Sequence, residues 1–131
     1  MQLNRALVLA SWQSWSASSL QRVGPYWLQW LWTVLFCLAA AVGFTVLGFF
    51  AFARESEGAW RNWPGWIEWY GRNLVVCLTI GALIHATFDL LGWLVGGQAT
   101  VRRWKPWQRT LFFSGVPLLC VAVGWPLGVT L

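Results

Sequence analysis

The stretch LQWLWTVLFCLAAAVGFTVLGFFAFA, residues 28–53, carries no charged side chain, and the charge-free run begins at Val23. An α-helix needs about 20 apolar residues to cross the hydrocarbon core of a bilayer, at about 1.5 Å per residue. This run is long enough to cross with tilt. Pro25 suits the first turn of a helix, where its missing N–H costs nothing. The sequence therefore predicts a first transmembrane helix near residues 27–53.

Two further apolar runs follow. The second, NLVVCLTIGALIHATFDLLGWLVGG, covers residues 73–97, and the third covers residues 110–131. Membrane helices tolerate proline because neighbouring groups satisfy the freed carbonyls, so Pro126 is acceptable in the third run and we expect a kink near Pro117. None of the runs shows the period-two alternation of a lipid-facing barrel. The expected fold is an all-α integral membrane protein, a bundle of three transmembrane helices, alone or as part of a four-helix membrane domain.

The composition supports this fold. Of the 131 residues, 58% are hydrophobic and 10% charged, whereas a soluble domain carries about 25% charged residues. An independent soluble globule, a disordered tail and a nucleic-acid-binding domain are therefore disfavoured. The net charge of +5 comes from nine Lys/Arg and four Asp/Glu that flank the apolar runs. The expected acidic partner is the headgroup layer of the lipid bilayer, not nucleic acid.

The basic residues are distributed unevenly between the segments that join the runs. Residues 54–72 hold three basic and three acidic residues, and the N-terminal segment 1–24 holds Arg5 and Arg22. The connector over residues 98–109 has no acid and four basic residues: Arg102, Arg103, Lys105 and Arg109. The positive-inside rule places the N-terminal segment and this basic connector in the cytoplasm and residues 54–72 outside. The sequence therefore predicts a multi-pass protein of the cell inner membrane with a cytoplasmic N-terminus.

The N-terminal segment is not a convincing signal peptide, because its apolar core is short and bulky tryptophans follow it. Val8, Trp12 and Trp15 fall at helical spacing. This spacing is typical of a short helix that lies in the membrane interface. A flexible cytoplasmic tail is the alternative.

Tryptophan is the most unusual feature of the composition, with 13 residues in the chain. Trp60, Trp63, Trp66 and Trp69 recur at every third position of the outer connector. Indole prefers the headgroup region, since it has an apolar body and one N–H donor. We interpret the four as a stripe in the outer membrane interface, interrupted by the Pro-Gly pair at 64–65. An aromatic cage for a cation or a quinone-like ring is the alternative.

His85 and Asp89 are the ionisable residues of the second run. His85 lies near the middle of the run, and Asp89 lies one turn closer to the cytoplasm. Their spacing of four places them on one helix face. An aspartate at the bilayer centre costs about 2.5–3.5 kcal/mol on insertion scales, so it usually faces the bundle interior and has a partner. Three interpretations remain open: an interhelical hydrogen-bond clamp, which we favour, a proton or ligand sensor, and a transport relay.

Small residues predict how the helices associate. A heptad-like row in the second run consists of Leu78, Ala82, His85, Asp89, Gly92 and Gly96. Gly92 and Gly96 form a small-xxx-small pair that lets another helix approach closely. The same spacing recurs at Gly124 and Gly128 and at Ala39 and Gly43. These pairs predict a homodimer or packing against partner membrane helices.

No catalytic, cofactor-binding or metal-binding constellation is evident. Cys37, Cys77 and Cys120 lie in different runs, with no Cys-x-x-Cys pair. They are typical of small apolar packing residues. A single histidine cannot build a metal site alone, and we expect no cofactor.

The stretch GRNLVVCLTIGALIHATFDLL, residues 71–91, resembles the second membrane span of bacterial LytS-type (AlgZ-like) sensor histidine kinases. In that family an outer loop precedes a helix of the type R-N-x-x-V…I-G-x-x-I-H. The matching positions are Arg72, Asn73, Val76, Ile80, Gly81, Ile84 and His85. The likeness extends loosely from Tyr26 to Leu131 through the order of the spans and the basic inner connector.

The resemblance implies a four-span sensory domain followed by a cytoplasmic dimerisation and ATP-binding kinase region. This chain departs from that pattern, because it has no phospho-acceptor histidine box, no ATP-binding boxes and no fourth span. Three spans leave Leu131 on the outer face, so we expect a piece of a longer protein. The expected function is the membrane-embedded sensory part of a two-component sensor histidine kinase. The alternative is a small stand-alone membrane protein that acts as a helix-packing partner or a transporter component.

Overall fold

The computed structural model describes residues 3–17, 19–52 and 61–131. Within these ranges every regular element is helical. The elements are α1 (Arg5–Ser16), α2 (Tyr26–Phe52), α3 (Trp63–Leu94), α4 (Gln98–Arg103) and α5 (Pro106–Thr130). Among the described residues, three helices, α2, α3 and α5, are long and apolar enough to cross a membrane. The prediction of an all-α membrane protein with three transmembrane helices is confirmed.

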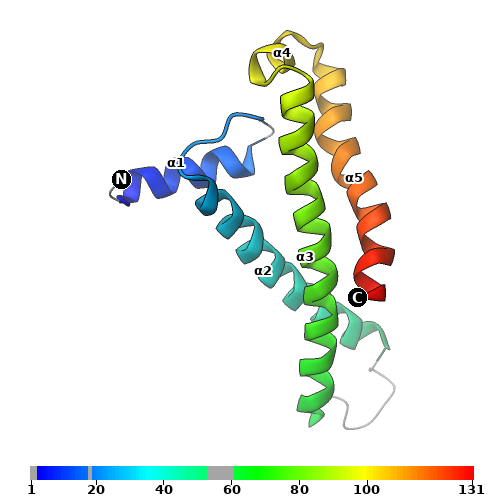
Figure 1. Ribbon diagram of the computed structural model, residues 1–131. Helices are drawn as coiled ribbons and strands as arrows, with labels where there is room; N and C mark the ends of the chain where they lie inside the picture. Colours follow the sequence, from blue (N-terminus) through cyan, green and yellow to red (C-terminus); the bar gives the residue numbers. More distant parts are fainter. Residues whose placement is uncertain (1–2, 18, 53–60) are drawn as a thin grey trace.

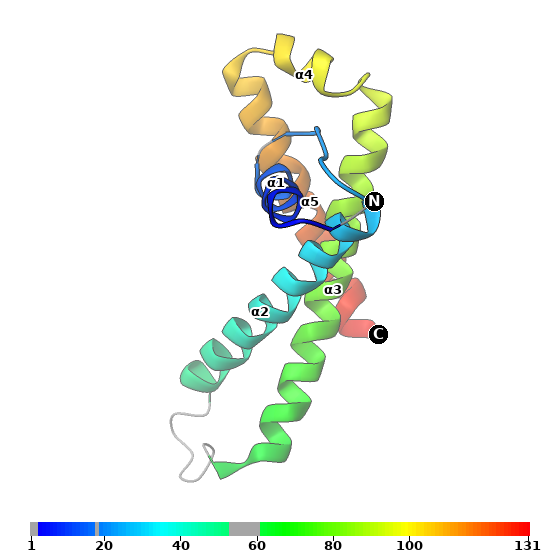
Figure 2. The same cartoon turned by 90° about the vertical axis from the view of Figure 1, so that its left-hand side faces the viewer.

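The longest helix, α3, lies at the centre of the molecule (Figure 1). Both α2 and α5 pack along it, and α2 crosses it obliquely (Figures 1 and 2). The helix α1 runs transverse to α3 and leaves the bundle at the N-terminal end of α2 (Figure 1). The short helix α4 connects the C-terminal end of α3 to the start of α5 (Figure 1).

The N-terminal helix α1 settles one alternative left open by the sequence. Asn4 is its N-cap, and the Asn4 side chain accepts a hydrogen bond from the backbone N–H of Leu7 at 2.8 Å. Such a cap satisfies one of the free N–H groups of the first turn. Trp12 and Trp15 stack on each other with ring centroids 5.4 Å apart. The helical interpretation of this segment is therefore confirmed over residues 5–16.

The helix α3 begins ten residues before the predicted run. Pro64 occupies its first turn, and the Asn62 side chain accepts a hydrogen bond from the Gly65 N–H at 3.2 Å. Proline is favourable there because its fixed φ suits a helix start. Glu68 and Arg72 form an i,i+4 ion pair of 2.6 Å in this early part. Residues 63–72, which are part of the predicted outer connector, are helical. An apolar run marks only the apolar part of a helix, so the prediction misses a polar helix end.

The other end of α3 is set by two glycines. Gly96 and Gly97 have φ angles of 85° and 79°, which glycine adopts without the penalty of a Cβ. The Gly97 N–H donates to the Gly92 carbonyl at 2.8 Å, which closes the helix end. The helix stops at Leu94, so the prediction that Gly92 and Gly96 form a pair on one helical face is wrong.

The helix α5 begins at Pro106, four residues before the predicted run, again with proline in the first turn. It continues through Pro117 and Pro126 as one helix, so the expected kink does not divide it. A Cβ on Gly124 would lie 2.9 Å from Ile80 Cγ1, and one on Gly128 would lie 2.7 Å from Val76 Cα. The predicted close approach at these two glycines is thus made within the chain, against α3.

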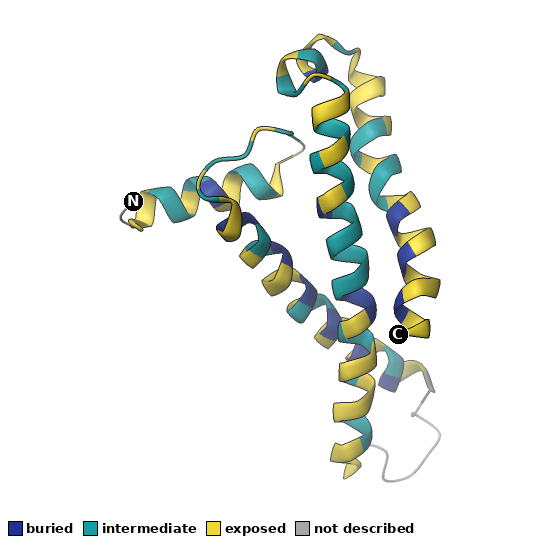
Figure 3. Ribbon diagram, viewed as in Figure 1, coloured by how far each residue is buried: buried dark blue, intermediate teal, exposed yellow. Residues whose placement is uncertain are grey.

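Buried residues follow the inner faces of the helices, and their outer faces are exposed (Figure 3). The core cluster consists of Cys37, Ala41 and Cys77. The exposed surfaces carry many large apolar side chains, such as Leu118 and Leu119 of α5. This pattern suits helices whose outer faces contact lipid, because acyl chains solvate such side chains without cost.

Candidate functional site

A buried polar cluster joins α1 to the first two turns of α2. The Gln29 amide donates to Ser11 Oγ at 3.0 Å and to the Val23 carbonyl at 2.7 Å. Trp32 Nε1 donates to the same Ser11 hydroxyl at 3.1 Å. Ser11 and Gln29 are 0% and 1% exposed. Because unpaired polar groups are costly in an apolar environment, these bonds fix α1 against α2.

His85 lies at the contact between α2 and α3 and is 3% exposed. Its Nδ1 lies 3.0 Å from Oγ1 of Thr33, which also accepts a hydrogen bond from Nε1 of Trp15 at 3.0 Å. The imidazole stacks on Trp30 with ring centroids 4.1 Å apart. One hydroxyl on α2 therefore connects α1 to α3.

These partners determine the tautomer of a neutral His85. The Trp15 indole can only donate, so Thr33 accepts there and has one proton of its own to give. Its acceptors are Nδ1 of His85 at 3.0 Å and the Gln29 carbonyl at 3.3 Å. The Nε2 of His85 faces Oδ2 of Asp89 at 3.5 Å. A proton on Nε2 avoids two facing lone pairs, so Thr33 donates to Nδ1.

Asp89 lies one turn further along α3 and has two more partners. Its Oδ2 accepts a hydrogen bond from the Tyr26 hydroxyl at 2.8 Å, and its Oδ1 lies 3.5 Å from the Arg22 guanidinium. The side chains of Arg22 and Asp89 are 26% and 32% exposed. The predicted pair of His85 and Asp89 on one helix face is thus found, with one partner from the segment between α1 and α2 and one from the start of α2.

The position of this pair along α3 is nearer the C-terminal end of the helix than its place in the predicted run suggests. His85 lies nine residues before Leu94, the last residue of α3, about 14 Å along a helix axis. It falls in the last third of α3 because the helix begins early, at Trp63. Asp89 lies five residues before the end of α3.

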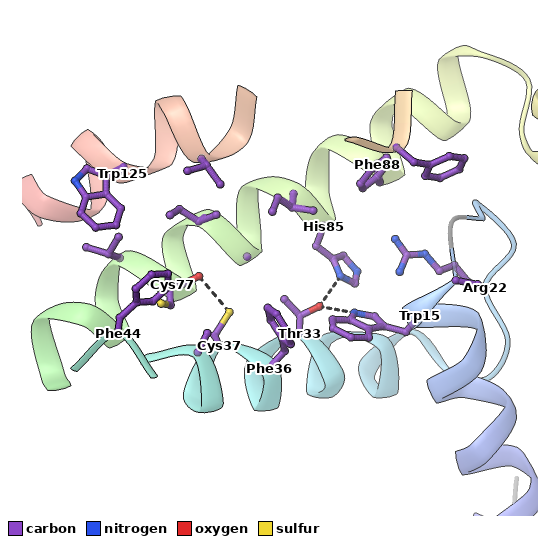
Figure 4. Close-up of a pocket in the computed structure, with 18 of the residues that line it drawn as sticks. Trp15, Arg22, Thr33, Phe36, Cys37, Phe44, Cys77, His85, Phe88 and Trp125 are labelled. Carbon is purple, nitrogen blue, oxygen red and sulfur yellow. Dashed lines mark hydrogen bonds between the residues drawn. The ribbon is translucent and has the colours of Figure 1, made fainter. Parts of the chain in front are cut away.

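A cavity of about 600 Å³ lies beside this polar group (Figure 4). Arg22, Thr33 and His85 line one end of it. The cavity continues between α2, α3 and α5 past Cys37 and Cys77 to Phe44 and Trp125 (Figure 4). Its walls are almost entirely apolar, so the polar atoms are concentrated at one end.

Three of the four tryptophans of the predicted outer connector lie in the part of the chain that the structure describes. Trp66 stacks on Phe49 of α2, with ring centroids 3.6 Å apart, and Trp69 packs against the same ring at 5.5 Å. Trp63 is 70% exposed. Trp60 lies outside the described residues. Three of the four thus lie on the first turns of α3, two of them in the contact with α2.

The basic residues of the predicted inner connector lie on the surface. All four are exposed, on α4 or at the start of α5: Arg102, Arg103, Lys105 and Arg109. The Lys105 backbone N–H donates to the side chain of Gln108 at 2.9 Å and so fixes the start of α5. The helix α4 lies at the end of α3 opposite the start of that helix (Figure 1).

The cysteines occupy packing positions. The Cys37 thiol donates to the Cys77 backbone carbonyl at 3.1 Å, and the Cys120 thiol lies 3.6 Å from the Thr87 hydroxyl. Within the described ranges no group of His, Cys, Asp and Glu side chains could hold a metal ion.

Sequence reasoning missed most partners of His85 and Asp89. Gln29 and Thr33 are isolated polar residues in an apolar run, one turn apart, and this spacing was the available signal. In the sequence Arg22 stands out only as a charge that sets membrane topology. Its distance of 67 positions from Asp89 along the chain hides the contact, which depends on how the segment after α1 folds back.

The fold and the site define an all-α multi-pass membrane protein with a buried polar group beside an apolar cavity. Comparisons with protein-family models, with curated proteins and with solved structures find no match to this chain.

Proposed function

We propose that the chain is the membrane-embedded sensory part of a two-component sensor histidine kinase of the bacterial inner membrane. The resemblance of residues 71–91 to the second span of LytS-type kinases supports the class. In this proposal the exposed basic patch on α4 and α5 faces the cytoplasm, where a kinase region would act.

The observation that carries the sensory role is the continuous row of polar contacts across three elements. It runs from Trp15 on α1 through Thr33 on α2 to His85 and Asp89 on α3, and then to Arg22. A shift of α3 relative to α2 must break or rearrange it. The row therefore couples the position of α1 to the packing of the span helices.

The row can exist in two arrangements. With neutral imidazole, Thr33 donates to Nδ1 of His85. A protonated imidazole donates at both nitrogens, so Thr33 would turn its proton to the Gln29 carbonyl, 3.3 Å away. A stimulus that favours one arrangement shifts the population of the corresponding helix packing.

The test uses inner-membrane vesicles from cells that express this chain from its natural transcription unit. We expect ATP-dependent phosphorylation of a histidine on a polypeptide that contains this chain or co-purifies with it. His85→Ala and Asp89→Asn should change the phosphorylation level. Thr79→Val is the matched control, since the Thr79 hydroxyl bonds within its own helix to the Val75 carbonyl. Absence of any phosphorylated polypeptide would overturn the kinase assignment.

A second candidate is a small membrane protein that acts by packing against partner helices, a second copy of itself included, or as a transporter component. The observation that favours it lies on α2. Ala39 is exposed, and a Cβ on Gly43 would meet nothing within 4 Å. This small-residue pair therefore stays open to another helix, unlike Gly124 and Gly128.

Native electrophoresis in mild detergent tests this candidate. We expect Gly43→Leu to remove a dimer or a larger complex that the unmodified chain forms. Gly115→Leu, at another glycine without neighbours within 4 Å, should retain it. A monomer in all three proteins would exclude association through α2.

A further inference from the structure

The cavity beside His85 has the size and the lining of a ligand site. Its volume of about 600 Å³ lies in the range of roughly 300–1,000 Å³ that is typical of small-molecule pockets. Pockets of this kind combine apolar walls with a few convergent polar groups. Here the polar groups converge at one end, where Arg22 and His85 point toward one another from the α1–α2 segment and α3 (Figure 4).

The polar end offers more donors than it uses. The Nε2 of His85 is buried and has no hydrogen-bond partner in the structure, since its 3.5 Å contact with Asp89 is longer than a hydrogen bond. Arg22 has five N–H groups, and the ion pair with Asp89 uses one nitrogen. A ligand atom placed here should therefore be an acceptor, and a carbonyl oxygen suits both donors.

The charges at this end favour a neutral ligand. The carboxylate of Asp89 lies against the guanidinium of Arg22 at 3.5 Å, so the two charges offset each other. An added carboxylate would lie close to Asp89 in an apolar environment, where an unpaired charge is costly. A neutral carbonyl oxygen would accept from Nε2 without that cost.

Aromatic rings surround the same end. Trp15, Phe36 and Phe88 lie around His85 and Arg22 (Figure 4), and Phe113 of α5 also lines the cavity. Flat rings prefer to stack against or contact the edges of other rings. The ligand group that carries the carbonyl is therefore best accommodated as a planar ring.

The rest of the cavity is a long apolar channel. On α2 it is lined from Thr33 to Phe44, which are eleven positions or about 16 Å apart along the helix. Small residues keep it open, namely Ala40 on one wall and Gly81 on another. This shape fits a hydrocarbon chain that lies along the membrane-spanning helices.

We propose that the cavity binds a neutral lipid-soluble molecule of the quinone type, with a planar carbonyl-bearing ring between Arg22 and His85 and its alkyl chain along α2 toward Phe44. The idea deepens the proposed sensory function, because such a ligand would be the stimulus that acts on the Trp15–Thr33–His85 row. No electron transfer is part of the proposal.

The test is photolabelling of the purified full chain in phosphatidylcholine nanodiscs with an azido derivative of decylubiquinone. Val121→Phe places a ring in the cavity from α5, whereas Val123→Phe, the matched control, adds the same ring at a position on α5 that does not line the cavity. We expect labelling of cavity residues that excess decylubiquinone suppresses. Val121→Phe should weaken the apparent binding of decylubiquinone about ten-fold, because the added phenyl group fills space that the ligand needs. Val123→Phe should bind like the unmodified chain.

A second variant and a second competitor distinguish a quinone site from a site for lipid acyl chains and from nonspecific labelling. Ala40→Leu fills the cavity from α2 and replaces Val121→Phe if that variant loses its helical circular dichroism. Suppression by oleate as effective as that by decylubiquinone would overturn the ring assignment, since a lipid acyl chain would then be the occupant. Labelling that is unsaturable, or equal in all variants, would overturn the site. Saturable binding without any change in phosphorylation would leave the site intact and refute only the sensory function.

Discussion

Thr33 Oγ1 on α2 lies 3.0 Å from Nδ1 of His85 on α3. The same oxygen accepts the Trp15 indole N–H at 3.0 Å. One hydroxyl thus serves three helices. The contact makes the position of α1 depend on the packing of α2 against α3.

Replacement of Thr33 by valine keeps the shape and removes the hydroxyl. We expect Thr33→Val to lower the free energy of unfolding by about 1–2 kcal/mol, because interhelical hydrogen bonds in membranes are typically worth about 1 kcal/mol each. Denaturation with sodium dodecyl sulfate in mixed micelles measures the change. Thr79→Val should change it much less, since the Thr79 hydroxyl bonds to the Val75 carbonyl of its own helix.

The Arg22–Asp89 contact should show measurable coupling. In a double-mutant cycle of Arg22→Gln and Asp89→Asn we expect a coupling energy of up to about 1 kcal/mol, the usual range for a partly exposed ion pair. The cycle for Arg72 and Glu68, whose side chains are 78% and 62% exposed, should give a smaller value and lose it in high salt. A larger coupling for the exposed pair would contradict the difference in exposure between the two pairs.

The close approach of α5 to α3 predicts a position-specific effect at glycine. A Cβ on Gly128 would lie 2.7 Å from Val76 Cα, a backbone atom that cannot move aside alone. We expect Gly128→Ala to destabilise the α3–α5 pair by about 1–3 kcal/mol, as overpacking does. Gly115→Ala, where a Cβ meets nothing within 4 Å, should be neutral or stabilising by up to about 1 kcal/mol from helix propensity. Equal effects at both positions would show that α5 does not pack as described.

The span helices could be predicted from the sequence because hydropathy acts over whole segments. Residues 28–53 are apolar almost throughout, so a membrane-spanning helix is predicted whichever of its faces points to the bundle. The helix ends depend on single residues instead. Pro64 and Asn62 extend α3 toward its N-terminus, and Gly96 with Gly97 stops it, which the apolar pattern does not encode.

The candidate site could be predicted only in part, for a related reason. His85 and Asp89 stand out locally because polar groups are rare within spans, and their spacing places them on one face. Their partners Thr33 and Arg22 come from other elements. Those contacts depend on the crossing of α2 over α3 and on the return of the chain after α1, which no local pattern specifies.

The distribution of Lys and Arg makes a topology prediction that the fold alone does not test. Six of the nine lie in the N-terminal segment and residues 98–109, and three lie in residues 54–72. The positive-inside rule therefore places α1 and α4 in the cytoplasm and the start of α3 outside. Two single cysteines test it: Arg61→Cys, just before α3, and Ala99→Cys, on an exposed position of α4.

A membrane-impermeant maleimide should label Arg61→Cys in spheroplasts and should label Ala99→Cys only after the membrane is opened. The unmodified chain provides the background, because Cys37, Cys77 and Cys120 are all buried. Neither substitution weakens the charge bias, since the first removes an outer cation and the second removes none. The reverse labelling pattern would place the basic patch outside the cell, away from any cytoplasmic kinase, and would contradict the sensory function together with the topology.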